Sequence, residues 1–181
     1  MVGLADCNNF YVSCERLFNP SLNDRPVVVL SNNDGCIIAR SNEAKNHGIK
    51  MGQSLYESWG MIEKHNIAVY SSNYALYGDL SNRVMTLLGN FVEEYEIYSI
   101  DESFLSFNGF QNYNLYEYGE KIVRTVRRGT GIPISLGIAE TKTLAKVANK
   151  FAKKYSAYRS VCIIDNNDKR EKALRLFDVA D

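Results

Sequence analysis

The sequence predicts an α+β fold in which a β-α-β-β-α-β core is interrupted by a smaller inserted unit. Short runs rich in Val and Ile alternate with longer segments whose apolar residues have helical spacing. One hairpin, residues 96–107, stands near the middle of the chain. Residues 20–75 separate the first strand from the next long helix, and they contain strand and turn signals of their own.

The chain begins with an apolar strand at Val2–Cys7 and continues into a short helix over Asn9–Phe18. Pro20 ends that helix, because proline lacks the N–H that a helix interior needs. The first strand therefore ends in Asp6 and Cys7, directly before a helix N-terminus.

The insertion begins with a hairpin. Pro26–Leu30 is a strongly β-branched strand, Asn32–Gly35 has the composition of a tight turn, and Cys36–Arg40 returns as a second strand. Two helical stretches follow, a short one at Asn42–His47 and a weaker one over residues 51–65.

The second half completes the core. Tyr74–Tyr95 and Asn112–Arg128 carry apolar stripes typical of amphipathic helices, and Ile132–Ala139 is a strand. Without the insertion this order is the split β-α-β, ferredoxin-like arrangement, in which the first strand lies beside the central hairpin. Asp6 should then approach the acids of that hairpin.

The remaining elements are a helix, a strand and a helix. Thr141 is a suitable N-cap for a helix over Thr141–Lys154. Val161–Ile164 is a short apolar strand, and Lys169–Phe177 is helical.

Asp101 and Glu102 interrupt an otherwise apolar and hydroxyl-bearing run. Burying unpaired charges is costly, so adjacent acids between two strands favour a cation. With Asp6 they would supply the hard oxygen ligands that Mg²⁺ prefers in sites that share substrate phosphates. Acids on a solvated hairpin turn are the alternative.

Composition excludes several classes of protein. The chain has 181 residues, 45% of them hydrophobic and 23% charged, and no apolar run approaches the roughly 20 residues that span a bilayer. The N-terminus lacks a basic secretory region, and the four cysteines show no Cys-x-x-Cys pair. We therefore expect a cytoplasmic globular protein without structural zinc or membrane association.

The net charge is zero but unevenly distributed. Residues 121–154 contain nine Lys or Arg and one acid, a balance of +8, and the rest of the chain carries −8. A basic segment beside an acidic cluster favours a site that handles phosphates with the help of a metal, whereas a solvated helix face is the simpler alternative.

Several motifs together resemble the Y-family of translesion DNA polymerases, in the same order over nearly the whole chain. They are Asp6-Cys7-Asn8-Asn9-Phe10-Tyr11, Asn19-Pro20-Ser21-Leu22, Arg25-Pro26-Val27-Val28-Val29-Leu30, Glu43-Ala44-Lys45, Gly48-Ile49-Lys50-Met51-Gly52, Tyr98-Ser99-Ile100-Asp101-Glu102, Gly137-Ile138-Ala139 and Lys142-Thr143-Leu144-Ala145-Lys146. The loop Ser31-Asn32-Asn33-Asp34-Gly35-Cys36 resembles more narrowly the UmuC-type branch, the catalytic subunit of bacterial polymerase V.

The resemblance implies template-directed transfer of a nucleotide from a dNTP to a primer, with two Mg²⁺ ions or Mn²⁺ in their place. Asp6, Asp101 and Glu102 match the catalytic metal ligands, and the backbone carbonyl of Cys7 is a further ligand. Tyr11 matches the aromatic steric gate that excludes a ribose 2′-hydroxyl.

The remaining positions implied by the resemblance bind the nucleotide. The amides of Asn9, Phe10 and Tyr11 would face the triphosphate, with Lys45 and Lys153 near its phosphates. Lys146 and Lys153 lie seven residues apart and so share one helix face. Arg40 ends the inserted hairpin, where it approaches the base or phosphate or is simply solvated.

Two segments depart from the family pattern. Asn8 stands where many members have an acid, and Ala39-Arg40-Ser41-Asn42 replaces a stretch that usually carries threonine and tyrosine hydroxyls. Both departures suit the UmuC-type branch, and the second removes the usual hydroxyl contacts to phosphate.

The resemblance also implies a division into domains. Residues 1–19 and 76–165 would form the palm, 20–75 the fingers and 166–181 the start of a thumb, and the little-finger domain is absent. We expect such a fragment to bind nucleotide weakly and to extend primers poorly or not at all. The implied partners are primer–template DNA and dNTP, and for a full-length protein a sliding clamp, a UmuD-type dimer and a recombinase filament.

Two other classes of function remain open. A nucleotide cyclase would use a similar two-metal hairpin, and a non-catalytic interaction module would carry the same acids as surface charges. His47 and His65 have no ligand partner at useful spacing and are interpreted as surface or packing residues. Tyr70, Tyr74 and Tyr77 could stack on a template or pack in a core.

Overall fold

The computed structural model of the protein describes residues 1–177. Residues 178–181, the end of the predicted thumb segment, lie outside this range. The chain forms two compact units, one made of Met1–Asn8 with the chain from Ser81 onward and the other of Asn9–Leu80. The predicted palm and fingers boundaries at residues 19/20 and 75/76 stay a prediction, since the two units divide at 8/9 and 80/81.

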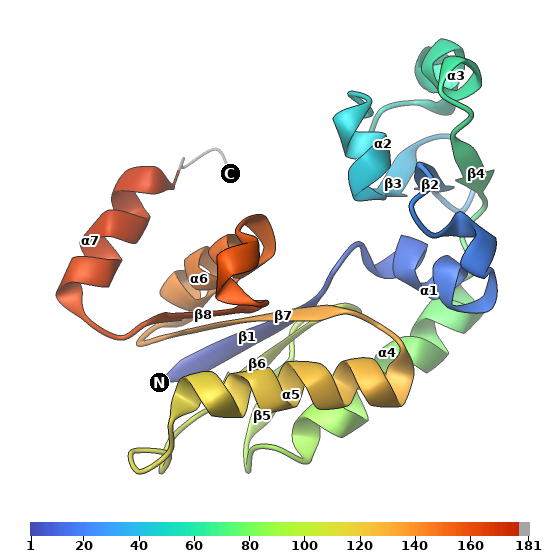
Figure 1. The fold of residues 1–181 in the computed structure, drawn as a ribbon. Coiled ribbons are helices and arrows are strands. Elements are labelled where there is room, and N and C mark those ends of the chain that lie inside the picture. The colour runs from blue at the N-terminus through green and yellow to red at the C-terminus, as the bar shows by residue number, and fades with distance from the viewer. Residues whose placement is uncertain (178–181) are drawn as a thin grey trace. The chain divides into compact units, whose positions relative to one another are not determined.

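The first unit contains a five-stranded sheet in the order β5-β6-β1-β7-β8 (Figure 1). Its strands are β1 (Val2–Cys7), β5 (Tyr95–Ile97), β6 (Glu102–Ser106), β7 (Ile134–Ala139) and β8 (Val161–Ile164). Strand β1 is antiparallel to both β6 and β7, whereas β7 and β8 are parallel. The first strand lies beside the central hairpin, as the sequence predicts.

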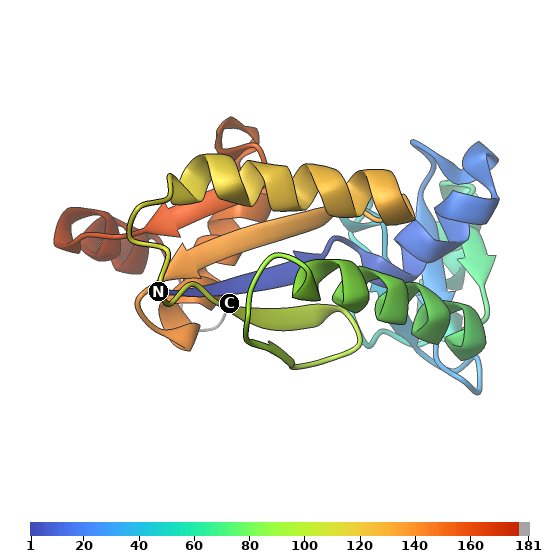
Figure 2. The same ribbon diagram turned by 90° about the horizontal axis from the view of Figure 1, so that it is seen from below.

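Helices cover both faces of this sheet. They are α5 (Leu115–Thr130), α6 (Lys142–Lys154), α7 (Asn167–Leu176) and the later turns of α4 (Tyr74–Gly89). Helices α4 and α5 lie side by side on one face, and α6 lies on the other (Figures 1 and 2). Burial of Leu4 and Phe104 against Ala148 and Phe151 of α6 forms one hydrophobic core. The sheet therefore holds β1 rigidly from both sides.

The second unit contains a three-stranded sheet in the order β3-β2-β4. Its elements are α1 (Phe10–Phe18), a 3-10 turn at Pro20–Leu22, β2 (Val27–Leu30), β3 (Ile37–Arg40), α2 (Asn42–Asn46), α3 (Leu55–Lys64) and β4 (Ala68–Tyr70). The predicted hairpin of β2 and β3 is present. The three-residue strand β4, parallel to β2, was not predicted because so short a run has no clear periodicity.

Several predicted helices differ in their ends, among them α5, which begins at Leu115 rather than at Asn112, and α3, which begins at Leu55 rather than at residue 51. Helix α4 stops at Gly89 rather than at Tyr95, because Tyr95–Ile97 pairs with β6. Helix α7 begins two residues early, at Asn167, where the Asn166 side chain accepts a hydrogen bond from the Lys169 amide. Strand pairing decides the end of α4, and side-chain capping decides the start of α7.

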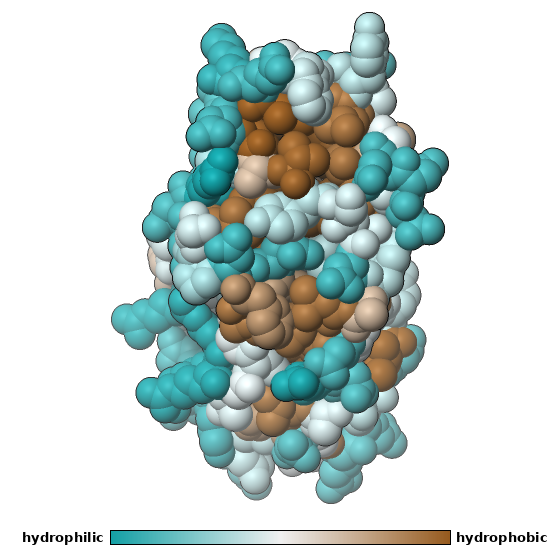
Figure 3. All heavy atoms as spheres, turned by 90° about the vertical axis from the view of Figure 1, so that its right-hand side faces the viewer, coloured by the Kyte–Doolittle hydropathy of each residue, from teal (hydrophilic) through white to brown (hydrophobic). Residues whose placement is uncertain are grey.

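Apolar residues are also exposed, and Figure 3 shows them gathered in patches among polar side chains on the face that it views. In the second unit, Tyr56 is 91% exposed and Trp59 is 50% exposed. All four cysteines are free thiols, and only Cys36 is exposed. Within residues 1–177, none of the helices combines the length and apolar character needed to cross a membrane.

Candidate functional site

The structure brings the three predicted acids together at one end of the first unit's sheet. Asp6, at the end of β1, pairs in register with Glu102 at the start of β6. The Cys7 amide donates a hydrogen bond of 2.9 Å to the carbonyl of Asp101. The end of β1 is thus tied to the turn between β5 and β6, which places both turn acids beside Asp6.

Ser99 organises that turn, although the sequence did not single it out. Its hydroxyl donates to Asp101 Oδ1 at 2.7 Å and accepts from the amides of Asp101 and Glu102 at 3.3 and 3.1 Å. A serine hydroxyl can bond the backbone two residues further on, which favours such a local turn. Ser99 therefore orients the Asp101 carboxylate.

Lys153 forms an ion pair with Asp6, with 2.5 Å between Nζ and Oδ2. Asp6 is largely buried, its side chain 13% exposed. Burial raises the pKa of Asp6 to about 6, while the Lys153 ammonium lowers it and the charges of Asp101 and Glu102 raise it further. A lysine thus supplies part of the positive charge that this cluster of acids favours.

Lys146 lies on the same face of α6, as predicted. Its Nζ is 3.9 Å from Glu102 Oε2 and 4.3 Å from the centre of the Tyr98 ring. The basic face of α6 therefore meets the acidic end of the sheet.

Asn149 and Gly137 set the position of α6. The buried Asn149 amide donates to the carbonyls of Leu4 and Ser135 at 3.0 and 2.9 Å. At Gly137 an added Cβ would lie 2.1 Å from the Asn149 backbone nitrogen and 2.3 Å from the Ala145 carbonyl oxygen. Only glycine permits this approach, which places Lys153 one turn after Asn149 and beside Asp6.

The acids fit a divalent metal in chemistry and charge. Asp6, Asp101 and Glu102 offer carboxylate oxygens, the hard ligands that Mg²⁺ prefers. Within residues 1–177, no three acid, histidine or cysteine side chains are already gathered closely enough to enclose an ion. The three acids therefore lie at the same end of the sheet without forming a closed set of ligands.

A second group of predicted residues lies in the second unit. Lys45 Nζ donates to Asn9 Oδ1 at 2.7 Å and to Asn42 Oδ1 at 3.4 Å. Asn9 precedes α1 in a left-handed conformation, with φ of 46°, and its side chain does not cap the helix. A helix N-terminus next to a lysine is an environment that favours anions.

Tyr11 is half-buried in an aromatic cluster of the second unit. Its ring stacks on that of Tyr77, with centroids 4.4 Å apart and planes at 15°. Tyr77 is completely buried, whereas Tyr74 is 46% exposed and meets Tyr11 edge-on. The sequence left open whether these tyrosines stack on a template or pack in a core. Tyr77 packs in the core.

Arg40 forms its hydrogen bond within the second unit. Its Nη1 donates to the Ile49 carbonyl at 2.5 Å, and its Nε is buried without an acceptor among the described residues. The predicted site residues thus form two groups: Asp6, Asp101, Glu102 and Lys153 in the first unit, and Asn9, Phe10, Tyr11, Arg40 and Lys45 in the second.

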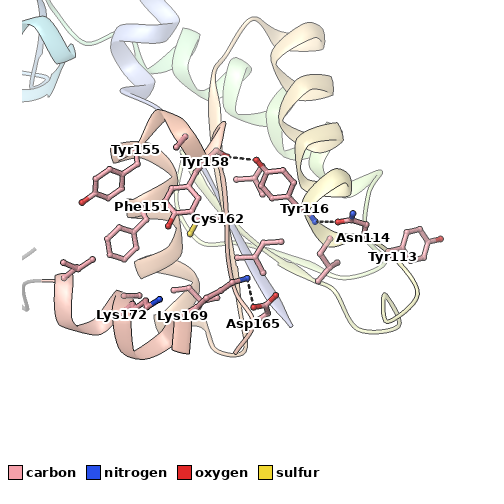
Figure 4. Close-up of a pocket in the computed structure, with 17 residues that line it drawn as sticks. Tyr113, Asn114, Tyr116, Phe151, Tyr155, Tyr158, Cys162, Asp165, Lys169 and Lys172 are labelled. Atoms are coloured by element: carbon pink, nitrogen blue, oxygen red, sulfur yellow. Dashed lines mark hydrogen bonds and ion pairs between the residues drawn. The ribbon is translucent and has the colours of Figure 1, made fainter. Parts of the chain in front are cut away.

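A large groove in the first unit lies apart from the acids. Its volume is about 1060 Å³, and aromatic residues of α5, α6 and the segment before β8 line it, with β8 at its centre (Figure 4). Tyr116 donates to the Tyr158 carbonyl at 3.4 Å, and Lys169 pairs with Asp165 at 2.8 Å. None of the predicted site residues lines it.

Comparison with known proteins gives one consistent result. Residues 5–150 match the model of the impB/mucB/samB family. Protein UmuC of Salmonella typhimurium is 46% identical over 183 residues, covering 100% of this chain and 43% of the relative. DNA polymerase IV of Saccharolobus solfataricus is 29% identical, covering 100% of this chain and 51% of the relative.

The solved structures agree. DinB from Sulfolobus solfataricus is 25% identical with a TM-score of 0.79, covering 91% of this chain and 48% of that one. The insertion ternary complex of Dbh DNA polymerase has a TM-score of 0.85 at 24% identity and covers 98% and 52% of the two chains. This chain spans less than half the length of the first curated relatives that it matches.

Proposed function

Because this chain belongs to the impB/mucB/samB family, we propose that it carries the nucleotidyl-transfer centre of a translesion DNA polymerase of the UmuC type. The observation that carries this proposal is the register of β1 and β6, which sets Asp6 opposite Glu102. The hydrogen bond from the Cys7 amide adds Asp101 to the same group.

Asp6, Asp101 and Glu102, with the Cys7 carbonyl, would hold two Mg²⁺ ions, or Mn²⁺ in their place. Such ions activate a primer 3′-hydroxyl and neutralise charge on a triphosphate. Lys153 would exchange Asp6 for a phosphate oxygen, since a lysine is a mobile point charge with three donors. The Ser99 hydroxyl would orient the Asp101 carboxylate for this role.

The second unit carries the other residues that we propose for nucleotide binding. The first amides of α1, at Asn9, Phe10 and Tyr11, and the ammonium of Lys45 are the donors proposed for the triphosphate. The Tyr11 ring is the proposed steric gate against a 2′-hydroxyl. Arg40 completes the proposed set.

The proposed partners follow from this activity. They are primer–template DNA and dNTP, and in a longer protein a sliding clamp, a UmuD-type dimer and a recombinase filament. The basic segment 121–154 supports DNA binding through its surplus of Lys and Arg. The proposed setting is the cytoplasm.

The proposal is tested with Asp101→Asn, which keeps the size of the side chain. We expect Mg²⁺-dependent dNTP binding, measured by calorimetric titration, to weaken by at least about tenfold, because a metal ligand loses its charge. Glu96→Gln is the matched control, since Glu96 lies in the same hairpin but pairs with Lys142 on the exposed edge.

An Mg²⁺ titration unchanged by Asp101→Asn would overturn the proposed metal role and favour a non-catalytic module. Pyrophosphate release in the absence of primer would instead identify a nucleotide cyclase. The relatives named as DNA polymerases favour primer extension over that alternative.

A further inference from the structure

Tyr77 places a polar hydroxyl in a fully buried position. Its hydroxyl donates a hydrogen bond of 2.7 Å to Glu15 Oε1. A buried hydroxyl without a partner is destabilising, and a hydrogen bond to a carboxylate is stronger than one between neutral groups. This contact therefore fixes the position of the Tyr77 hydroxyl and the orientation of the side-chain axis.

The Tyr11 ring depends on that orientation. It lies on the face of Tyr77, with centroids 4.4 Å apart and planes at 15°. Tyr74 meets both rings edge-on, with centroids 6.0 Å from Tyr11 and 6.1 Å from Tyr77. A displacement of the Tyr77 side chain would therefore remove the surface on which Tyr11 rests.

The two helices that carry these residues are joined by the same contact. Glu15 follows Tyr11 by four residues on α1, so both side chains lie on one helix face. Tyr77 lies in the first turn of α4, where Asn73 accepts from the Leu76 amide through its side chain and from the Tyr77 amide through its carbonyl. The hydroxyl–carboxylate bond thus fixes Tyr11 relative to the start of α4.

The hydroxyl also remains a donor under physiological conditions. Burial and the neighbouring Glu15 carboxylate both raise the pKa of Tyr77 well above its ordinary value of 10. The hydrogen bond from Tyr77 to Glu15 is therefore kept at neutral pH.

We infer that Tyr77 and Glu15 are positioning residues that hold the Tyr11 ring in the orientation that discriminates a deoxyribonucleotide from a ribonucleotide. This inference rests on the proposed function, in which Tyr11 is the steric gate. Neither residue is proposed to touch the nucleotide itself.

The test compares binding of dATP and ATP, with Mg²⁺, to the 181-residue chain and its variants. Tyr77→Phe keeps the ring and removes the hydroxyl, and Glu15→Ala removes the acceptor. We expect each to lower the preference for dATP over ATP by about fivefold, the scale of one hydrogen bond. The affinity for dATP should change less, because dATP has no 2′-hydroxyl for the Tyr11 ring to exclude.

Glu15→Gln is the conservative variant, because its amide oxygen still accepts from the Tyr77 hydroxyl, and most of the preference should return. Tyr70→Phe is the matched control, since it removes a tyrosine hydroxyl that accepts from Asn19 in the same unit. Selective ¹³C labelling of tyrosine then reports the Tyr11 ring by NMR without any nucleotide. We expect its signals to move in Tyr77→Phe and Glu15→Ala only.

Two results would overturn the inference. If the wild type prefers dATP and both variants keep that preference, the positioning role alone is wrong. If the wild type binds dATP and ATP equally, the gate role of Tyr11 falls together with the inference. The Asp101→Asn titration is independent of both results and still tests the metal site.

Discussion

At the scale of single residues, Asp6 shows how the site combines burial with charge. Its carboxylate is largely buried beside two other acids, and Lys153 compensates only part of the cost. Charged groups in such places are retained for binding more often than for stability. Asp6 should therefore destabilise the metal-free protein at neutral pH.

Asp6→Asn tests this expectation. The folded pKa of about 6 lies above the ordinary value of 3.8, so stability is greatest below pH 4 and falls as pH rises through 6. Without metal, Asp6→Asn should be more stable than the wild type by about 1–3 kcal/mol at pH 7.5 and show no gain at pH 4. Urea unfolding of the wild type and of Asp6→Asn at pH 7.5 and at pH 4 measures the difference in the free energy of unfolding.

Asp165→Asn is the control, since Asp165 forms an exposed ion pair with Lys169 and should change stability by less than about 0.5 kcal/mol. A gain from Asp6→Asn that is the same at both pH values would contradict the electrostatic explanation.

His47 and His65 form a second residue-scale contact that spacing could not reveal. Their rings stack with centroids 4.1 Å apart. Burial, and then the charges of His47 and Lys64, lower the pKa of His65 below its ordinary value of 6.5. The neutral His65 side chain should therefore stabilise the second unit at pH values above 6.5. This contribution should be lost as the pH falls through the lowered pKa.

A proton NMR titration of the histidine rings measures this effect. We expect His65 to titrate below pH 6.5 and His47→Gln to raise its pKa, because one repelling charge is removed. Lys50→Gln serves as the control, since Lys50 is a cation of the same unit that does not lower the His65 pKa. An unchanged His65 titration in His47→Gln would refute the coupling.

At the scale of elements, the contact of α6 with β7 determines the site. Helix α6 approaches the sheet at Gly137 and is held there by two hydrogen bonds from Asn149. The same helix carries Lys146 and Lys153 to the acids. A change in this packing should therefore affect stability and nucleotide binding together.

Gly137→Ala is expected to destabilise the protein by about 2–3 kcal/mol, because its Cβ would overlap the backbone of α6. Gly60→Ala in α3 is the control. No atom lies within 4 Å of its added Cβ, so it should stabilise by about 0.5–1 kcal/mol. Thermal unfolding of both variants measures the contrast, and equal effects would show that the close packing is unimportant.

At the scale of the whole molecule, the chain has two compact units and less than half the length of its first curated relatives. Because phosphate contacts dominate affinity for DNA, the proposed palm and fingers by themselves should hold a primer–template weakly.

The 181-residue chain should therefore bind Mg²⁺ and dNTP weakly and extend a labelled primer poorly or not at all. A gel-based extension assay at low salt measures this, with a longer family member as the positive control. Robust extension by the 181-residue chain would refute the expectation.

The sequence alone determined most elements of the fold. The alternation of β-branched runs and helical stripes predicted β1, the β2–β3 hairpin, β8 and the Thr141 cap of α6, because these depend on local preferences. It missed β4 and misplaced the end of α4, since strand pairing with distant residues decides both.

The sequence also predicted that Asp6 lies beside Asp101 and Glu102, because the order of elements predicts which strands are neighbours. Only the tertiary structure showed that Lys153 pairs with Asp6, that Asn149 fixes α6 and that Tyr77 lies buried under Tyr11. Such contacts depend on the distance between segments far apart in the chain. A sequence records which side chains are present, and packing decides which of them meet.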